Sequence, residues 1–285
     1  KRWGIDPQSP EELRLFRYAV ARFSAYPMIL WDTGIDIGET RSDDWIDWFA
    51  DWFVANDPWQ HPVSSRTGGG SGGKFPENAT YYSDGTSRLP NPEVIVNNWL
   101  SRSVPTAYTD RWREDYARGD FDRDRIRRAV WEVGLMQGAA VYVSGNENGG
   151  YLDETYRTDF RAAPQLGLRE RFFRDRIANL GRLVPHNELI DSADSVVLSA
   201  DPGREYVAYF PGGGSANLDL SAATRGASIE WYNPRTGDTT NRGATTAGRV
   251  VSFTAPDMND WVLHVSARSV DFCCHAHLPQ VVRQW

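Results

Sequence analysis

Acidic side chains follow two segments that have the apolar pattern of strands. A short apolar run at 28–31 leads into a polar loop that carries three carboxylates. They are Asp32, Asp36 and Glu39. A second segment at 105–109 ends in Asp110. Two carboxylates can cleave a glycosidic bond, since one protonates the leaving oxygen and the other attacks the anomeric carbon or activates water.

The elements that must position these groups alternate between strand and helix patterns. Five strand-like segments are separated by helical ones, which predicts βαβ units and a parallel sheet. The segments are 28–31, 61–65, 80–83, 105–109 and 140–144. In a (β/α)8 TIM-type barrel, reactive groups lie at the C-terminal ends of the strands, and a complete barrel needs eight strands and about 250 residues. We therefore expect a partial barrel of about five βα units whose first part is missing, unless the fold is an open variant.

Helix signals support this order of elements. Ser9 and Glu12 have the spacing of a capping box at the start of the first helix. Ser42 caps a second helix, and its aromatic stripe indicates packing in a core. The stripe consists of Trp45, Trp48, Phe49, Trp52 and Phe53. A last helix is expected over about 164–180, because Gly181 follows as a C-terminal signal.

The periodicity changes at about Val184, where short strand-like segments and turn clusters replace the helices. The segments are 195–199, 205–210, 228–232, 249–253 and 260–265. Short strands separated by Gly- and Pro-containing turns predict a small antiparallel β-sandwich. We expect Tyr209, Trp231 and Trp261 to be buried in its core. The predicted parts are a barrel part, a sandwich and an unassigned tail, at 1–183, 184–267 and 268–285.

Composition excludes several classes of protein. The net charge of -7 argues against nucleic-acid binding, which needs clustered Lys and Arg. No apolar run approaches the ~18 residues that span a bilayer, so we expect no membrane partner. The Gly-rich stretch 68–73 matches neither a phosphate-binding loop nor a dinucleotide fingerprint. The aromatic residues, 12 each of Trp, Tyr and Phe, suit both a core and the apolar faces of sugar rings.

Two adjacent cysteines, Cys273 and Cys274, leave three alternatives open: a vicinal disulfide, a metal pair or two free thiols. His275 and His277 follow directly, but the spacing matches no zinc pattern built from two separated ligand pairs. We therefore expect neither a metal nor an organic cofactor.

Four sequence motifs carry a resemblance to a known family. They are ARFSAYP at 21–27, which leads into the first predicted strand, YFPGG at 209–213, WYNPRTG at 231–237, and FTAP at 253–256 continuing to WVLHV at 261–265. The chain resembles the apiosidase-like glycoside hydrolases over residues 9 to about 267. These enzymes are (β/α)8 barrels with carboxylate pairs. Their C-terminal sandwich bears the name of a collagen-binding domain, which we do not take as evidence of collagen binding.

The resemblance implies a role for each acidic strand end. The first loop in these enzymes commonly ends in an acid/base residue after glycine, and Asp36 aligns with that position. The nucleophile, most often Glu, usually ends the strand that corresponds to 105–109, and here Asp110 stands there, with Glu114 as an alternative. We expect Asp36 and Asp110 at the same end of the sheet, with carboxyl groups about 5–10 Å apart.

Aromatic and polar side chains near these strand ends are candidates for substrate binding. They are Trp31, Glu39, His61, Tyr82, Arg111, Trp112 and Glu147. For each of them, core packing or a solvated surface position is the alternative interpretation.

These features predict a glycoside hydrolase that acts on a polysaccharide or oligosaccharide. The alternative is a non-catalytic carbohydrate-binding or interaction protein built on a truncated barrel. Open strand edges invite pairing with another chain, so we expect a homodimer. No signal peptide is visible in the sequence, and we expect a secreted or periplasmic protein.

Overall fold

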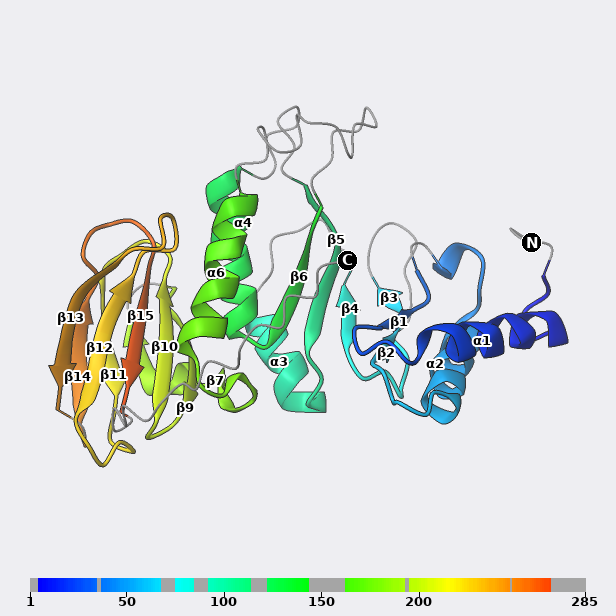
Figure 1. Ribbon diagram of the computed structural model, residues 1–285, viewed down its shortest axis with the longest axis horizontal. Coiled ribbons are helices and arrows are strands. Elements are labelled where there is room, and N and C mark those ends of the chain that lie inside the picture. Colours follow the sequence, from blue (N-terminus) through cyan, green and yellow to red (C-terminus); the bar gives the residue numbers. More distant parts are fainter. Residues whose placement is uncertain are drawn as a thin grey trace, which may run out of the picture.

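The computed structural model describes residues 5–34, 37–67, 75–84, 92–113, 122–143, 162–192, 195–246 and 248–267 (Figure 1). Its first part combines helices with short strands. In chain order these are α1 (Pro10–Phe23), β1 (Trp31–Asp32), η1 (Ile37–Glu39), α2 (Asp43–Asn56), β2 (Val63–Ser64), β3 (Arg66–Thr67), β4 (Tyr82–Asp84), α3 (Pro92–Arg102), β5 (Thr106–Arg113), α4 (Arg123–Leu135), β6 (Gly138–Val143) and α6 (Ala163–Arg176). Among the described residues, no helix is long and apolar enough to cross a membrane.

The strands of the first part pair in parallel and follow one another in chain order. β1 pairs with β2, and β3, β4, β5 and β6 form a second sheet in that order. Only Ser65 separates β2 from β3, so this segment connects the two sheets. The prediction of parallel strands is therefore confirmed, and helices separate β1 from β2, β4 from β5 and β5 from β6. Because the pairing is parallel throughout, the carboxyl ends of these strands lie at one edge.

Local capping signals were predicted correctly. The hydroxyl oxygen of Ser9 accepts from the backbone N–H of Glu12, and that of Ser42 accepts from Trp45. The Glu12 carboxylate, however, accepts from the backbone N–H of Gln8 and from the indole Nε1 of Trp45. It thus ties α1 to α2 instead of closing a capping box on Ser9.

Several boundary predictions were wrong. The run 28–31 is not a buried strand: β1 covers only Trp31–Asp32, and the side chains of Met28 and Leu30 are 91% and 59% exposed. The helix expected to reach residue 180 ends at Arg176, because Ile177 takes extended backbone angles and turns its side chain into the core. Gly181 lies instead in the 3-10 turn η2 (Leu180–Arg182).

The second part consists of two antiparallel sheets. The larger has the order β13-β12-β15-β10-β9-β7, and the smaller has the order β14-β11-β8. Their bounds are β7 (Val184–Pro185), η3 (Asn187–Leu189), β8 (Ile190–Ser192), β9 (Val197–Asp201), β10 (Glu205–Phe210), β11 (Ser215–Asp219), β12 (Ala227–Tyr232), β13 (Thr239–Thr245), β14 (Val250–Thr254) and β15 (Trp261–Ser266). Residues of both sheets share one apolar core, which includes Phe210, Leu218 and Phe253. Strands β7, β8, β11 and β13 were not predicted.

The larger sheet is covered on both faces. Trp231 and Trp261 are buried between the two sheets, as predicted. Tyr209 is also buried, but it points to the opposite face, where its ring stacks on Trp131 of α4 with 6.0 Å between ring centroids. Helices α4 and α6 pack on this face in a core that also contains Phe172 (Figure 1). The sheet is therefore joined to the first part by a continuous apolar core.

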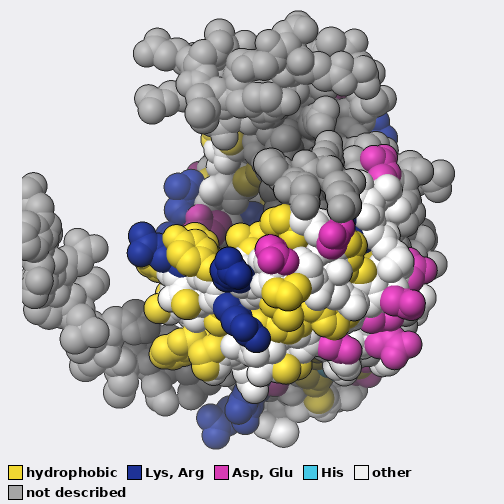
Figure 2. Space-filling model, turned by 90° about the vertical axis from the view of Figure 1, so that its right-hand side faces the viewer, with side chains coloured by type: hydrophobic (Ala, Val, Ile, Leu, Met, Phe, Trp, Pro, Cys, Tyr) yellow, Lys and Arg dark blue, Asp and Glu magenta, His cyan; other side chains and the backbone are white. Residues whose placement is uncertain are grey.

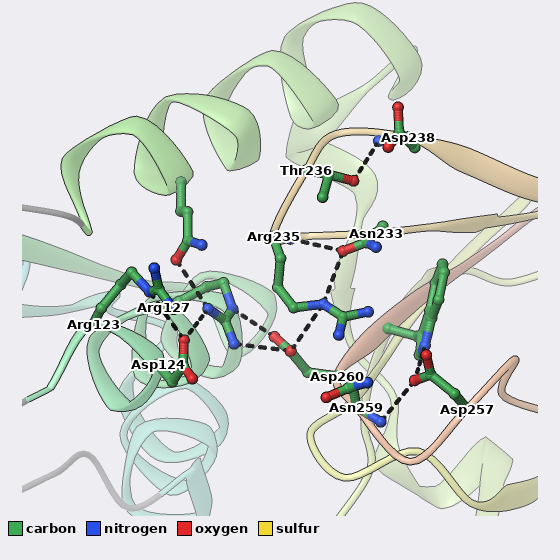
Figure 3. A network of polar contacts seen from close by, with 12 residues as sticks. Arg123, Asp124, Arg127, Asn233, Arg235, Thr236, Asp238, Asp257, Asn259 and Asp260 are labelled. Atoms are coloured by element: carbon green, nitrogen blue, oxygen red, sulfur yellow. Dashed lines mark hydrogen bonds and ion pairs between the residues drawn. The ribbon is translucent and has the colours of Figure 1, made fainter.

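A buried polar network crosses the same junction (Figure 3). Arg127 of α4 donates two hydrogen bonds to the carboxylate of Asp260, of 2.7 and 2.9 Å. The Tyr209 hydroxyl donates to the same carboxylate at 2.9 Å. Asp124 and Gln165 accept from the remaining Nη1 group of Arg127. The side chains of Arg127 and Asp260 are 2% and 1% exposed, so each buried charge depends on the other.

A second charged cluster lies between α6 and the larger sheet. The Nε2 and Nδ1 atoms of His264, on β15, each lie 3.2 Å from a carboxylate oxygen, of Glu205 and Glu230 respectively. Arg176 of α6 donates to Glu230 at 2.6 Å. Burial lowers the pKa of His264, but the hydrogen bonds and charges of both glutamates outweigh it and hold that pKa above its ordinary value. Folding therefore stabilises the protonated imidazole.

This cluster predicts a pH dependence of stability. Because the pKa of His264 is raised in the folded state, its contribution is complete below the unfolded value of about 6.5 and is lost as pH rises through the folded value. We expect the free energy of unfolding to fall across that window, with a slope of at most about 1.4 kcal/mol per pH unit for one proton. Urea unfolding from pH 5.5 to 9 measures it. The difference between wild type and His264→Gln should shrink as pH rises, and a constant difference would contradict the prediction.

Candidate active site

Asp32 lies at the carboxyl end of β1 and is held by two donors. The Tyr81 hydroxyl donates to Asp32 Oδ2 at 3.0 Å, and the backbone N–H of Gly34 donates to Oδ1 at 2.8 Å. Tyr81 is buried and Asp32 is half-buried. Burial raises the pKa of Tyr81, and the charge and hydrogen bond of Asp32 raise it further. Tyr81 therefore stays a phenol that donates to the Asp32 carboxyl group.

Hydroxyl groups continue this polar surface across the neighbouring strands. Thr33 Oγ1 and Ser65 Oγ lie 2.8 Å apart, which links the residue after β1 to the residue after β2. Ser64, Ser65 and Ser83 are all buried, although the strands that carry them are short. Hydroxyls donate and accept hydrogen bonds, so Thr33 and Ser65 add groups of both kinds after the carboxyl ends of β1 and β2.

Asp110 lies within β5, not after it. The strand was expected to end at residue 109, but it continues to Arg113. The pairing of β5 with β6 changes register between Tyr108 and Trp112, so Asp110 sits in the irregular stretch. Such irregularities re-aim side chains and are frequent next to active sites. The backbone of Asp110, Arg111 and Trp112 belongs to the carboxyl-terminal half of β5, while their side chains lie outside the described part of the chain.

The remaining predicted site residues at this end are Asp36, Glu39, Tyr82 and Glu147. Asp36 and Glu147 lie outside the described residues, so the predicted spacing between Asp36 and Asp110 stays a prediction. Glu39 is exposed in η1, in the loop that follows β1. Tyr82 is half-buried, and its ring centroid lies 4.9 Å from that of Phe75.

Trp31 and His61 both contact Asp57, which follows the end of α2. Trp31 packs on Phe53 with 4.6 Å between ring centroids, and its Nε1 donates to Asp57 Oδ2 at 2.9 Å. His61 Nδ1 lies 2.6 Å from the same oxygen. Burial raises the pKa of Asp57, but the hydrogen bonds from Trp31 and His61 outweigh it and lower that pKa. His61 precedes β2, at the amino end of the strand, where residues of parallel barrels support stability, so we leave it out of the proposed site.

Sequence reasoning missed Tyr81 and Asp57. Tyr81 stood in a segment with a weak strand pattern, and only the pairing of strands brings its hydroxyl to Asp32, 49 positions away. Asp57 follows the end of α2 and looks like an ordinary polar loop residue. The described residues contain no group of three or more His, Cys, Asp or Glu side chains that could hold a metal ion.

Comparisons with known proteins match one region of the chain by sequence and most of it by structure. A family model described as "Putative collagen-binding domain of a collagenase" matches residues 184–266, the region of β7 to β15. A glycoside hydrolase family 5 structure from Bacteroides vulgatus ATCC 8482 is 14% identical with a TM-score of 0.65, and the match covers 88% of this chain and 65% of that one. A second structure, described as a glycoside hydrolase, is 15% identical with a TM-score of 0.63, covering 88% and 67%.

The chain thus shares the mixed helix-and-sheet fold of glycoside hydrolase structures. It spans about two thirds of the length of these two structures. No curated protein sequence matches it.

Proposed function

We propose that this chain is part of a glycoside hydrolase, built on a partial (β/α)8 barrel of about five βα units at 1–183 and a β-sandwich at 184–267. The observation that carries the proposal is the Asp32–Tyr81 pair at the carboxyl end of β1, at the edge toward which β5 carries Asp110. Reactive groups of parallel barrels lie at this edge. The fold shared with glycoside hydrolase structures supports the same reaction class.

The proposed reaction uses two carboxyl groups. Asp36, in the loop after β1, is the acid/base that protonates the leaving oxygen, and Asp110 is the nucleophile or the base that activates water. Asp32 is the second candidate for the acid/base role, because it is the carboxylate that the strand end holds in place. A separation of about 5–5.5 Å would make the enzyme retaining, and one of about 6.5–9.5 Å inverting.

A non-catalytic carbohydrate-binding protein is the second candidate function. The match of residues 184–266 to a family model described as a binding domain supports it. Binding by a free sandwich module is less favoured, since α4 and α6 cover one face of the larger sheet. The substrate proposed is a plant or microbial polysaccharide or oligosaccharide, and with it a secreted or periplasmic location.

A screen against glycans tests the proposed function. The purified chain is incubated with a panel of plant and microbial polysaccharides, and new reducing ends are measured. We expect release from at least one glycan, and no release by the Asp110→Asn variant. Binding without release by the wild type would favour the second candidate function instead.

A homodimer is the proposed state of association. The apolar surface lies on α1 and the following segment, where Leu15, Tyr18, Tyr26, Met28 and Leu30 are exposed. Figure 2 shows hydrophobic side chains gathered on this face, with arginines among them. The α2 stripe expected near the edge is instead packed against Phe16 of α1.

Sedimentation velocity at micromolar concentration measures this association. We expect a dimer, and we expect Met28→Glu with Leu30→Glu to shift it to the monomer, because charges on both surfaces of a two-fold contact repel each other. A wild-type monomer at these concentrations would contradict the proposal.

A further inference from the structure

A groove of about 500 Å³ lies between α6 and the turn that joins β12 to β13. Its walls include Arg171, Asp175 and Arg176 on the helix and Thr236 and Asp238 on the turn. This volume falls within the range of about 300–1,000 Å³ that is usual for ligand sites. The elements that line the groove, α6 and the turn between β12 and β13, lie far from β1 and β2 (Figure 1).

The walls of the groove are fixed by contacts between the helix and the sheet. The Tyr232 hydroxyl donates to the carbonyl oxygen of Leu168 at 3.0 Å. Gly237 has a φ of +85°, and a Cβ there would come within 2.7 Å of Leu168 Cδ2. Glycine is favoured at this turn because L side chains rarely adopt this φ, and the Leu168 side chain would also have to move.

Arg176 forms the inner wall. It donates to Glu230 at 2.6 Å and to Thr239 at 3.1 Å, and its guanidinium lies 5.3 Å from the ring centroid of Tyr232. These contacts hold the side chain in one position before any ligand arrives, which reduces the entropy lost on binding.

The outer wall keeps unused polar groups. Within the described residues, neither the Arg171 guanidinium nor the Asp238 carboxylate takes part in a hydrogen bond or ion pair, and both side chains are exposed. Asp175 is engaged only by its exposed neighbour Arg174. The groove thus presents a charged donor and a charged acceptor on facing walls, one from α6 and one from the turn.

The charges of the groove balance. Arg171 and Arg176 supply two positive charges, and Asp175 and Asp238 supply two negative charges. Both pairs act on the buried Tyr232: the arginines lower its pKa and the aspartates raise it, after the larger effect of burial. A ligand with a net charge would be attracted by the pair of opposite charge and repelled by the pair of like charge. A neutral ligand with many hydroxyls fits better, because each hydroxyl both donates and accepts, and hydrogen bonds to charged groups are the stronger ones.

We propose that this groove is a second saccharide site, which binds a neutral oligosaccharide segment away from the strand ends that carry the candidate active site. Both parts of the chain contribute to it, so the site exists only when the larger sheet is docked on α6. It would hold a polymer on the enzyme while another segment is cleaved. The binding does not require that the chain be catalytic.

Residue-specific titration tests the site. Amide NMR of the ¹⁵N-labelled chain is recorded with cellotetraose, xylotetraose, arabinotetraose and mannotetraose, and with tetragalacturonic acid as the charged comparison. We expect at least one neutral oligosaccharide to shift the amides of Thr236, Gly237 and Asp238, and the charged one to bind more weakly. Arg171→Ala combined with Asp238→Ala should weaken that binding by about tenfold or more.

A matched control removes the same charges elsewhere. Arg225→Ala combined with Asp191→Ala changes an exposed arginine and an exposed aspartate outside the groove and should leave the affinity unchanged. No shift at 236–238 with any neutral oligosaccharide, or an unchanged affinity in the groove variant, would overturn the proposal. If these amides shift but no glycan is cleaved, the groove stands and the proposed hydrolase function fails.

Discussion

Replacing Asp260 with alanine is expected to lower the free energy of unfolding by about 3–5 kcal/mol, the usual cost of removing one partner of a buried ion pair. The change leaves the Arg127 guanidinium, 2% exposed, without its bidentate acceptor. It also leaves the buried Tyr209 hydroxyl without the carboxylate that accepts from it. Urea unfolding followed by tryptophan fluorescence measures the loss.

Two further variants make this result specific. Asp191→Ala removes an exposed aspartate from β8 and should change the free energy of unfolding by no more than about 0.5 kcal/mol. Arg127→Met combined with Asp260→Leu removes both charges and should recover part of the loss, since apolar residues often replace buried ion pairs at little cost. A loss below about 1 kcal/mol in Asp260→Ala would show that water reaches Arg127 and that the junction is not sealed.

The junction explains which features of the fold the sequence could reveal. Helix starts at Ser9 and Ser42 depend on contacts within three residues, and both caps form as expected. Arg127 and Asp260 are 133 positions apart, and nothing in the local pattern of either residue indicates the other. Tyr209 was expected in the core of the sandwich for the same reason, but it lies in the core shared with α4 and α6, because both faces of its strand are buried.

Burial at the ends of elements was the least predictable feature. Met28 and Leu30 belong to an apolar run whose pattern predicts a core strand, yet both side chains are exposed. Their exposure depends on what packs beside β1, and the sequence of the run does not contain that information. Strand β13 was missed because its residues are polar and it forms an edge, where pairing with β12 stabilises it without apolar alternation.

The candidate site was predictable in outline and not in detail. Acidic residues after two strands were visible in the sequence, and parallel pairing brings both strand ends to one edge. Which carboxylate of the first loop is held by a donor was not visible, because Tyr81 reaches Asp32 only through the sheet. The resemblance favours Asp36, and the contacts of Asp32 make it the second candidate, so the two assignments need an experiment that separates their roles.

Asparagine variants of the three aspartates are expected to separate the acid/base from the nucleophile. Loss of general acid help lowers turnover by ~10²–10⁴-fold on a natural glycan, where the leaving oxygen needs a proton. The aryl group of an activated aryl glycoside leaves without being protonated. The acid/base variant should therefore lose much less activity on that substrate. Asp110→Asn should lose activity on both substrates, because attack at the anomeric carbon is needed whatever the leaving group.

Under the proposed assignment, kcat of Asp36→Asn falls on the natural glycan but much less on the aryl glycoside. Measuring kcat on both substrates tests this. If Asp32→Asn has that behaviour instead, the carboxylate that Tyr81 holds is the acid, and its hydrogen bond must then weaken when the proton binds. Asp191→Ala, far from the strand ends, serves as the control with unchanged kcat. Full turnover on the natural glycan in both Asp32→Asn and Asp36→Asn would contradict an acid in this loop. The proton would then have to come from another strand end of the same edge, since only groups at that edge can reach one glycosidic oxygen together.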